Sequence, residues 1–138
     1  MKIQIEVINE TNRSIDSRTI KKLTTTIWRQ EGQKDAHITI VLVPDSFIRN
    51  LNKKYLRKDR VTDVIAFPLT NDEEEPFEGE IYISLHRVQA NAKRFQIEFL
   101  QELKRVAAHG VLHFLGYDDQ TQEAKQAMTD REDFYLSY

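Results

Sequence analysis

The sequence HGVLHFLGYDD, residues 109–119, contains the pattern on which most of the predicted fold and site depends. Its two histidines, His109 and His113, are four residues apart, so on a helix both project from the same face. Gly116 follows as a residue able to end that helix and turn the backbone. The segment therefore predicts the last turns of a helix with two imidazole groups side by side, followed by a turn.

Two imidazoles at this spacing can hold one metal ion, and Asp119 follows where a returning chain could supply a third ligand. Three protein ligands leave one coordination position open, which is typical of catalytic rather than structural zinc. The alternative is that the histidines are polar surface residues or hydrogen-bonded core residues. Asp119 also stands just before a predicted helix, where an aspartate is commonly a cap, and Asp118 is an additional candidate ligand.

The apolar residues of the helix predicted over 97–115 help to decide between a metal site and two histidines that hold no metal. One side of it gathers Leu100, Leu103, Ala107, Val111 and Phe114. Both histidines project from roughly the opposite side. The apolar residues at positions 106, 112 and 115 predict that this side is covered as well. Two partly covered imidazoles need polar partners, and one shared metal ion satisfies both.

The composition limits the classes of protein to which this chain can belong. The chain has 138 residues, of which 40% are hydrophobic and 30% charged, as expected of one globular domain over residues 1–138. No signal-peptide core follows Met1, and no apolar run approaches the length of a membrane span. Cysteine is absent, so no disulfide supports the fold and any metal must be held by nitrogen and oxygen. These features predict a cytoplasmic protein.

Charge is segregated along the chain. The formal net charge of −2 argues against a protein that coats nucleic acid non-specifically. One short segment is nevertheless basic, through Lys53, Lys54, Arg57, Lys58 and Arg60. The acidic run at 72–75 predicts a solvated loop. As a lid, that loop would repel phosphate, which favours a protein-facing role for it.

Hydrophobic periodicity predicts an α+β fold, with a mixed sheet of about four strands packed with about five helices. Strands are expected at residues 2–8, 37–43, 61–67 and 80–85. Helices are expected from after Ser17 to a stop at Gly32, from residue 45, across 86–95, across 97–115, and from near 119 or 121 onward. The last helix is expected to carry four residues inward, which are Ala124, Met128, Phe134 and Tyr135.

The quoted segment resembles the signature H-G-x-L-H-x-x-G-Y-D-H of the YbeY family. A second match lies upstream, where residues 51–68 are similar to the family block L-N-x-x-[YF]-R-x-K-D-x-P-T-[DN]-V-L-S-F-P. Gly79-Glu80-Ile81 resembles the family's G-D-I strand start, and Met128 and Glu132 fit its closing helix. Together these matches extend in order from about residue 50 to the end of the chain.

This resemblance implies a metal-dependent endoribonuclease that hydrolyses single-stranded RNA. Its implied roles are maturation of ribosomal RNA at the 3′ end of the small-subunit RNA and ribosome quality control. It implies one zinc ion at the positions of His109, His113 and Asp119. The implied partners are ribosomal RNA and ribosomal particles, together with ribosomal or GTPase proteins. Neither DNA nor a membrane is an implied partner. The implied fold is a mixed sheet of about four strands packed with helices, with a metzincin-like metal helix.

The chain departs from the family pattern at two positions. Asp119 replaces the third histidine; a carboxylate is an accepted zinc ligand, but its charge leaves the identity of the metal open. Leu56 takes the place of the family's arginine, and Arg57 follows it. Arg57 is therefore the candidate catalytic residue, and a solvated surface charge is the alternative interpretation.

The predicted reaction is metal-assisted hydrolysis of a phosphodiester. Arg57, Lys58 or Arg60 would offset the negative charge that develops on the phosphate. Lys58, Arg60, Thr62 and Asp63 are the candidate substrate-binding residues. For Thr62 and Asp63 the alternative is that they only end a turn.

Two other functions are compatible with the residues. The first is a non-catalytic ribosome-assembly module in which the metal stiffens the fold. The second is a peptidase with metzincin-like spacing, but a peptidase of that type needs a glutamate directly after the first histidine as general base. Gly110 occupies that position, so peptide hydrolysis by that route is not expected.

Overall fold

A computed structural model describes residues 1–55 and 62–138 of the chain. Its elements in order are β1 (Ile3–Asn9), α1 (Ser17–Glu31), β2 (Ala36–Val43), α2 (Asp45–Tyr55), β3 (Val64–Pro68), β4 (Phe77–Ser84), α3 (Leu85–Phe95), α4 (Phe99–Phe114) and α5 (Gln122–Leu136). The predicted α+β class, with a four-stranded mixed sheet and five helices, is confirmed for the described residues. Among these residues, no helix combines the length and the apolar character needed to cross a membrane.

The four strands form one sheet in the order β1-β2-β4-β3. β1, β2 and β4 run parallel, whereas β3 pairs antiparallel with β4. β3 is therefore an edge strand of the sheet. The central strands are the most apolar, and Ile38, Ile40, Ile81 and Ile83 are fully buried on them, as expected of strands that lie inside a sheet.

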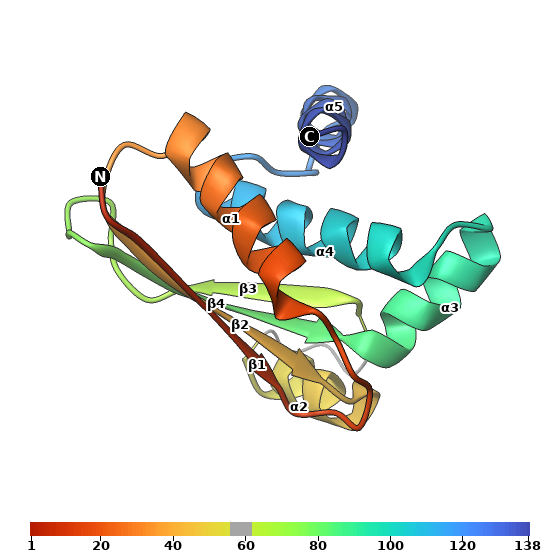
Figure 1. Cartoon of the computed structure of the whole chain (residues 1–138). Helices are drawn as coiled ribbons and strands as arrows, with labels where there is room; N and C mark the ends of the chain where they lie inside the picture. Colours follow the sequence, from red (N-terminus) through yellow and green to blue (C-terminus); the bar gives the residue numbers. More distant parts are fainter. Residues whose placement is uncertain (56–61) are drawn as a thin grey trace.

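The helices cover the two faces of the sheet unequally. α1 and α4 lie over one face and α2 lies against the other, while α5 packs on the outer side of α4 (Figure 1). The larger core cluster fills the space between the central strands and the α1/α4 layer. A smaller cluster of Val43, Ile48 and Ile65 lies under α2. α4 therefore packs between the sheet on one side and α5 on the other.

The close packing of α4 on the sheet depends on Gly110. A Cβ atom at this position would lie 2.9 Å from Cγ2 of Ile81, closer than such atoms approach each other in proteins. Glycine therefore lets the helix axis come near β4. Gly110, His109 and His113 line one cavity together with β3.

The end of α4 has the conformation that the sequence predicts. Gly116 adopts a left-handed backbone with φ of +99°. The amide of Gly116 donates to the carbonyl of His113, and the amide of Tyr117 donates to the carbonyl of Leu112. These two bonds form a Schellman motif, which satisfies carbonyl groups that the helix leaves free.

Two predictions about the elements need correction. β4 begins at Phe77, three residues before the predicted start at residue 80, because it pairs with β2 along the whole of Ala36–Val43. Phe134 of α5 is 42% exposed and not inward-facing, whereas Met128 and Tyr135 are buried as predicted. α5 packs chiefly on α4, so only one of its faces meets the core.

Candidate metal centre

His109 and His113 stand side by side on α4, as their spacing predicts. Their Nε2 atoms lie 3.2 Å apart, and their rings meet edge to face with centroids 4.7 Å apart. Two imidazole nitrogens that share a tetrahedral zinc ion, each about 2.0–2.1 Å from it, lie about 3.3 Å apart. The observed separation therefore fits a shared metal ion.

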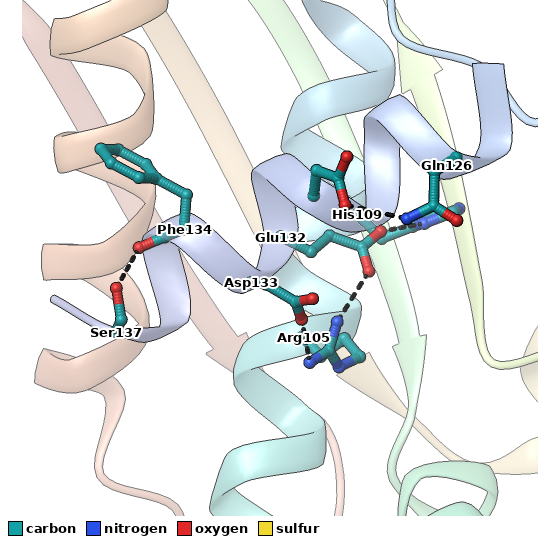
Figure 2. A network of polar contacts seen from close by, with 8 residues as sticks. Arg105, His109, Gln126, Glu132, Asp133, Phe134 and Ser137 are labelled. Carbon is teal, nitrogen blue, oxygen red and sulfur yellow. Dashed lines mark hydrogen bonds and ion pairs between the residues drawn. The ribbon is translucent and has the colours of Figure 1, made fainter. Parts of the chain in front are cut away.

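Glu132 of α5 orients the first of these histidines. Its Oε2 atom lies 2.7 Å from Nδ1 of His109, and its side chain is only 8% exposed. Because a carboxylate can only accept here, Nδ1 carries the proton and Nε2 presents its lone pair. Figure 2 shows Glu132 between His109 and Arg105, whose guanidinium lies 3.2 Å from the other carboxylate oxygen. A carboxylate behind a ligating histidine is the usual support of a protein metal site.

The two imidazoles differ in their electrostatic surroundings. Burial lowers the pKa of His109, but the hydrogen bond and charge of Glu132, with the charges of Asp63 and Asp119, raise it above its ordinary value. The pKa of His113 is lowered, first by burial and then by the charge of His109. The arrangement therefore favours a neutral His113 that can donate a lone pair to a cation.

Asp119 shares a cavity with the histidine pair but is not a helix cap. α5 begins at Gln122, and its N-cap is Thr121, whose hydroxyl accepts the amide of Ala124. The capping interpretation of Asp119 is therefore wrong. Asp119 is exposed and lies near enough for its charge to raise the pKa of both histidines.

The described residues contain no group of three His, Cys, Asp or Glu side chains arranged closely enough to hold a metal ion. Asp119 as the third ligand therefore stays a prediction. Asp118, the other candidate, accepts the amide of Gln120 in the turn before α5. That bond gives Asp118 a structural role, so Asp119 remains the better candidate.

A cavity of about 820 Å³ opens beside the histidine pair. Its walls come from β3 and the residues around it, including Thr62 and Asp63, and from α4 with the turn that follows it. Asp119 lies on that turn, and Thr70 and Asp72, which follow β3, also line the cavity, called the groove below. The groove therefore extends from the imidazoles along β3 to the residues that follow it.

The structure brings only some of the predicted substrate-binding residues to this groove. Thr62 and Asp63 both line it. The backbone carbonyl of Asp63 accepts the amide of Ser84, so this residue also begins the β3–β4 pairing. Arg57, Lys58 and Arg60 lie outside the described residues, and their predicted roles stay predictions.

Two polar groups that pack around α4 and the turn after it have no local signal as site residues in the sequence. Glu132, 23 residues from His109 in sequence, was noted only as fitting a family pattern. Glu31, the last residue of α1, accepts the hydroxyl of Tyr117 at 2.6 Å and also bonds Arg131 and Tyr135 of α5. No local spacing connects these positions, because the contacts form only when α1 and α5 pack around the end of α4.

The fold and the histidine pair define a class: an α+β protein with a supported imidazole pair on a helix beside an edge strand. A family model described as Endoribonuclease YbeY matches residues 4–138. The chain is 39% identical over 132 residues to the endoribonuclease YbeY of Chlorobaculum parvum, covering 96% of this chain and 92% of that one. The chain belongs to the YbeY endoribonuclease family.

Other comparisons agree with this membership. The endoribonuclease YbeY of Amoebophilus asiaticus is 43% identical over 110 residues, which are 80% of this chain and 74% of that one. The solution structure of TM1509 from Thermotoga maritima is similar to this fold with a TM-score of 0.70 and 31% identity, covering 97% of this chain and 87% of that one. The family is thus one of enzymes that carry the name endoribonuclease.

Proposed function

We propose that this protein is a metal-dependent endoribonuclease that cleaves single-stranded RNA during the maturation of ribosomal RNA. The observation that carries the proposal is the His109–His113 pair, with Nε2 atoms 3.2 Å apart and Glu132 behind the first ring. His109, His113 and Asp119 would hold the ion, for which zinc suits the nitrogen and oxygen donors. A divalent cation held there would supply Lewis-acid chemistry at a phosphodiester.

The residues of the chain have separate tasks in this proposal. Glu132 keeps the proton of His109 on Nδ1 and so keeps Nε2 free for the cation. Gly110 stands where a metallopeptidase has its glutamate base, so no side chain of that position takes a proton from water. Arg57, Lys58 or Arg60 would offset the charge that develops on the phosphate.

The shape of the groove supports cleavage within a strand. Because the groove continues along β3 from Asp63 to the region of Asp72, a strand bound at the histidines has room to extend beyond them. In the cell we expect the substrate to be the 3′ region of small-subunit ribosomal RNA, met on ribosomal particles in the cytoplasm. Ribosomal or GTPase proteins would be its protein partners, and ribosome quality control a further role.

Cleavage of a single-stranded oligoribonucleotide by metal-loaded protein tests the proposal. His113→Ala should abolish cleavage while leaving the melting temperature near that of the unaltered protein, because His113 is exposed. His86→Ala is the matched control, since His86 is also exposed but lies in a different part of the fold. Unchanged cleavage by His113→Ala would contradict the proposal. A metal-free sample that remains folded and still binds ribosomal particles, with no nuclease activity at any metal loading, would instead favour a non-catalytic ribosome-assembly module.

A further inference from the structure

The outer edge of β3 carries main-chain groups that the sheet does not use. The carbonyl of Asp63 accepts the amide of Ser84, and the amide of Leu69 donates to the carbonyl of Glu78. These two bonds bracket the antiparallel ladder from Val64 to Pro68. Because ladder bonds alternate along an antiparallel strand, positions 63, 65, 67 and 69 face β4 and positions 64, 66 and 68 face outward.

Pro68 agrees with this assignment, since proline is tolerated on an edge strand where its missing N–H would face away from the ladder. Val64 and Ala66 are left with both an N–H donor and a C=O acceptor on the outer edge. Within the described residues β3 pairs with β4 alone. The edge therefore offers donors and acceptors two residues apart, about 6.8 Å along the strand.

This edge borders the groove that passes the histidine pair. Both Val64 and Ala66 line that groove, and so does Phe114, the last residue of α4. Phe114 is half-buried, and its ring packs on Phe77 with centroids 4.9 Å apart. The lining thus provides both main-chain hydrogen bonds and an aromatic surface.

The charge of the groove indicates which part of a nucleic acid this stretch suits. Besides the two histidines, the ionisable residues of the described lining are Asp63, Asp72 and Asp119, and it contains no lysine or arginine. Asp63 and Asp72 would repel phosphate groups, whereas the charge of Asp119 would be offset by the cation that it holds. A nucleobase is uncharged, has donors and acceptors on its edge, and can stack on an aromatic ring. The described wall is therefore matched to bases and not to the phosphate backbone.

We propose that the outer edge of β3 at Val64 and Ala66, together with Phe114 in the lining of the same groove, is a base-binding subsite for single-stranded RNA beside the scissile bond. This inference rests on the proposed function and adds to it the part of the substrate that this wall recognises. The main-chain amide of Ala66 donates to an acceptor on the base edge. In a duplex the Watson–Crick edge of a base is occupied by its partner and both faces of the base are stacked, so a subsite that reads this edge and a face admits only unpaired bases.

The first test uses the unaltered protein and a set of oligoribonucleotides in which one abasic residue is moved stepwise past the cleavage site. We expect KM to rise about tenfold when the abasic residue reaches the subsite, as for the loss of one hydrogen-bonded or stacked base. KM should stay near that of the intact strand at distant positions. A flat scan, in which KM is the same at every position of the abasic residue, would overturn the proposal. This outcome needs no variant of the protein.

The second test links the effect to β3. Ala66→Pro removes the outward N–H but leaves the inward ladder bonds of Ile65 and Phe67 in place, and Ala66→Ser is the control that keeps the N–H. For the intact strand, a correctly folded Ala66→Pro protein should have a KM about tenfold higher than that of the unaltered protein. Placing the abasic residue at the subsite should then raise its KM almost no further. If the increases in KM caused by Ala66→Pro and by the abasic residue multiply, the base contact lies elsewhere and the proposal is overturned.

The two proposals fail differently. If the intact metal-loaded protein cleaves no RNA, the proposed function is contradicted. If it cleaves the intact strand and the abasic scan is flat, only the base subsite is contradicted. Inhibition by an extended basic peptide together with a flat scan would assign the edge to a polypeptide, which pairs with open strands by adding to the sheet, and would likewise overturn the subsite.

Discussion

Nδ1 of His109 lies 2.7 Å from Oε2 of Glu132, so a residue of the last helix sets the proton position of an imidazole on α4. Arg105 completes the arrangement, since its guanidinium bonds both Glu132 and the neighbouring Asp133 (Figure 2). The imidazole is thereby held in one tautomer before any ion binds. Such preorganisation raises metal affinity because less freedom is lost on binding.

Neutralising Glu132 should weaken metal binding more than it weakens the fold. For Glu132→Gln we expect a zinc affinity lower by about 10-fold or more, measured by competition with a chelator. Asp133→Asn is the matched control, because it neutralises the other carboxylate on Arg105 without touching His109. Equal affinities in the two variants would show that Glu132 does not support the site.

Asp119→Ala should lower the zinc content of purified protein sharply. The physical reason is the loss of the carboxylate nearest the histidine pair on the turn after α4, which is free of a capping role. Elemental analysis of Asp119→Ala beside Asp118→Ala measures this. The second variant should keep its zinc, because Asp118 bonds the amide of Gln120. If Asp118→Ala loses its zinc and Asp119→Ala keeps it, Asp118 is the ligand.

Glu31 should make stability depend on pH. Burial raises the pKa of this carboxyl, but hydrogen bonds from Tyr117, Tyr135 and Arg131 outweigh that effect and leave the pKa below its ordinary value of 4.5. A carboxyl with a lowered pKa in the folded state contributes stability that is complete above the unfolded-state pKa. That contribution is lost as the pH falls through the folded-state pKa.

We therefore expect Glu31→Gln to lose about 2 kcal/mol at pH near 7, as for hydrogen bonds to a charged group. The difference in unfolding free energy from the unaltered protein, measured by urea unfolding, should be constant well above pH 4.5 and should shrink as the pH falls below that value and through the lower folded-state pKa. Gln30→Ala is the control, because it removes a hydrogen bond between the uncharged side chains of Gln30 on α1 and Tyr138. A Glu31→Gln deficit that is constant with pH would contradict the expectation.

Gly116→Ala tests the turn that brings Asp119 back toward the helix. The backbone there has φ of +99°, and a Cβ atom would meet nothing within 4 Å, so the penalty is one of conformation alone. We expect a loss of about 1–2 kcal/mol, seen as a lower melting temperature. Gly110→Ala should also destabilise, but by a different cause, the contact with Ile81. A neutral Gly116→Ala would contradict the strain argument.

Local sequence determined the part of the site that lies within one helix and its turn. Because a helix repeats every 3.6 residues, the spacing of His109 and His113 alone places both rings on one face, and Gly116 alone explains the left-handed turn. The strand and helix order also follows from periodicity, since each element needs one apolar face for the core.

Tertiary structure decided the remainder. Neither the contact of Glu132 with His109 nor the link from Glu31 to Tyr117 has a local signal, because each depends on how separate helices pack. The start of β4 followed its pairing with β2 and not its own alternation. The role of β3 as an edge strand facing a groove is likewise a property of the assembled sheet, in which hydrogen-bonding groups left over by pairing become available to a ligand.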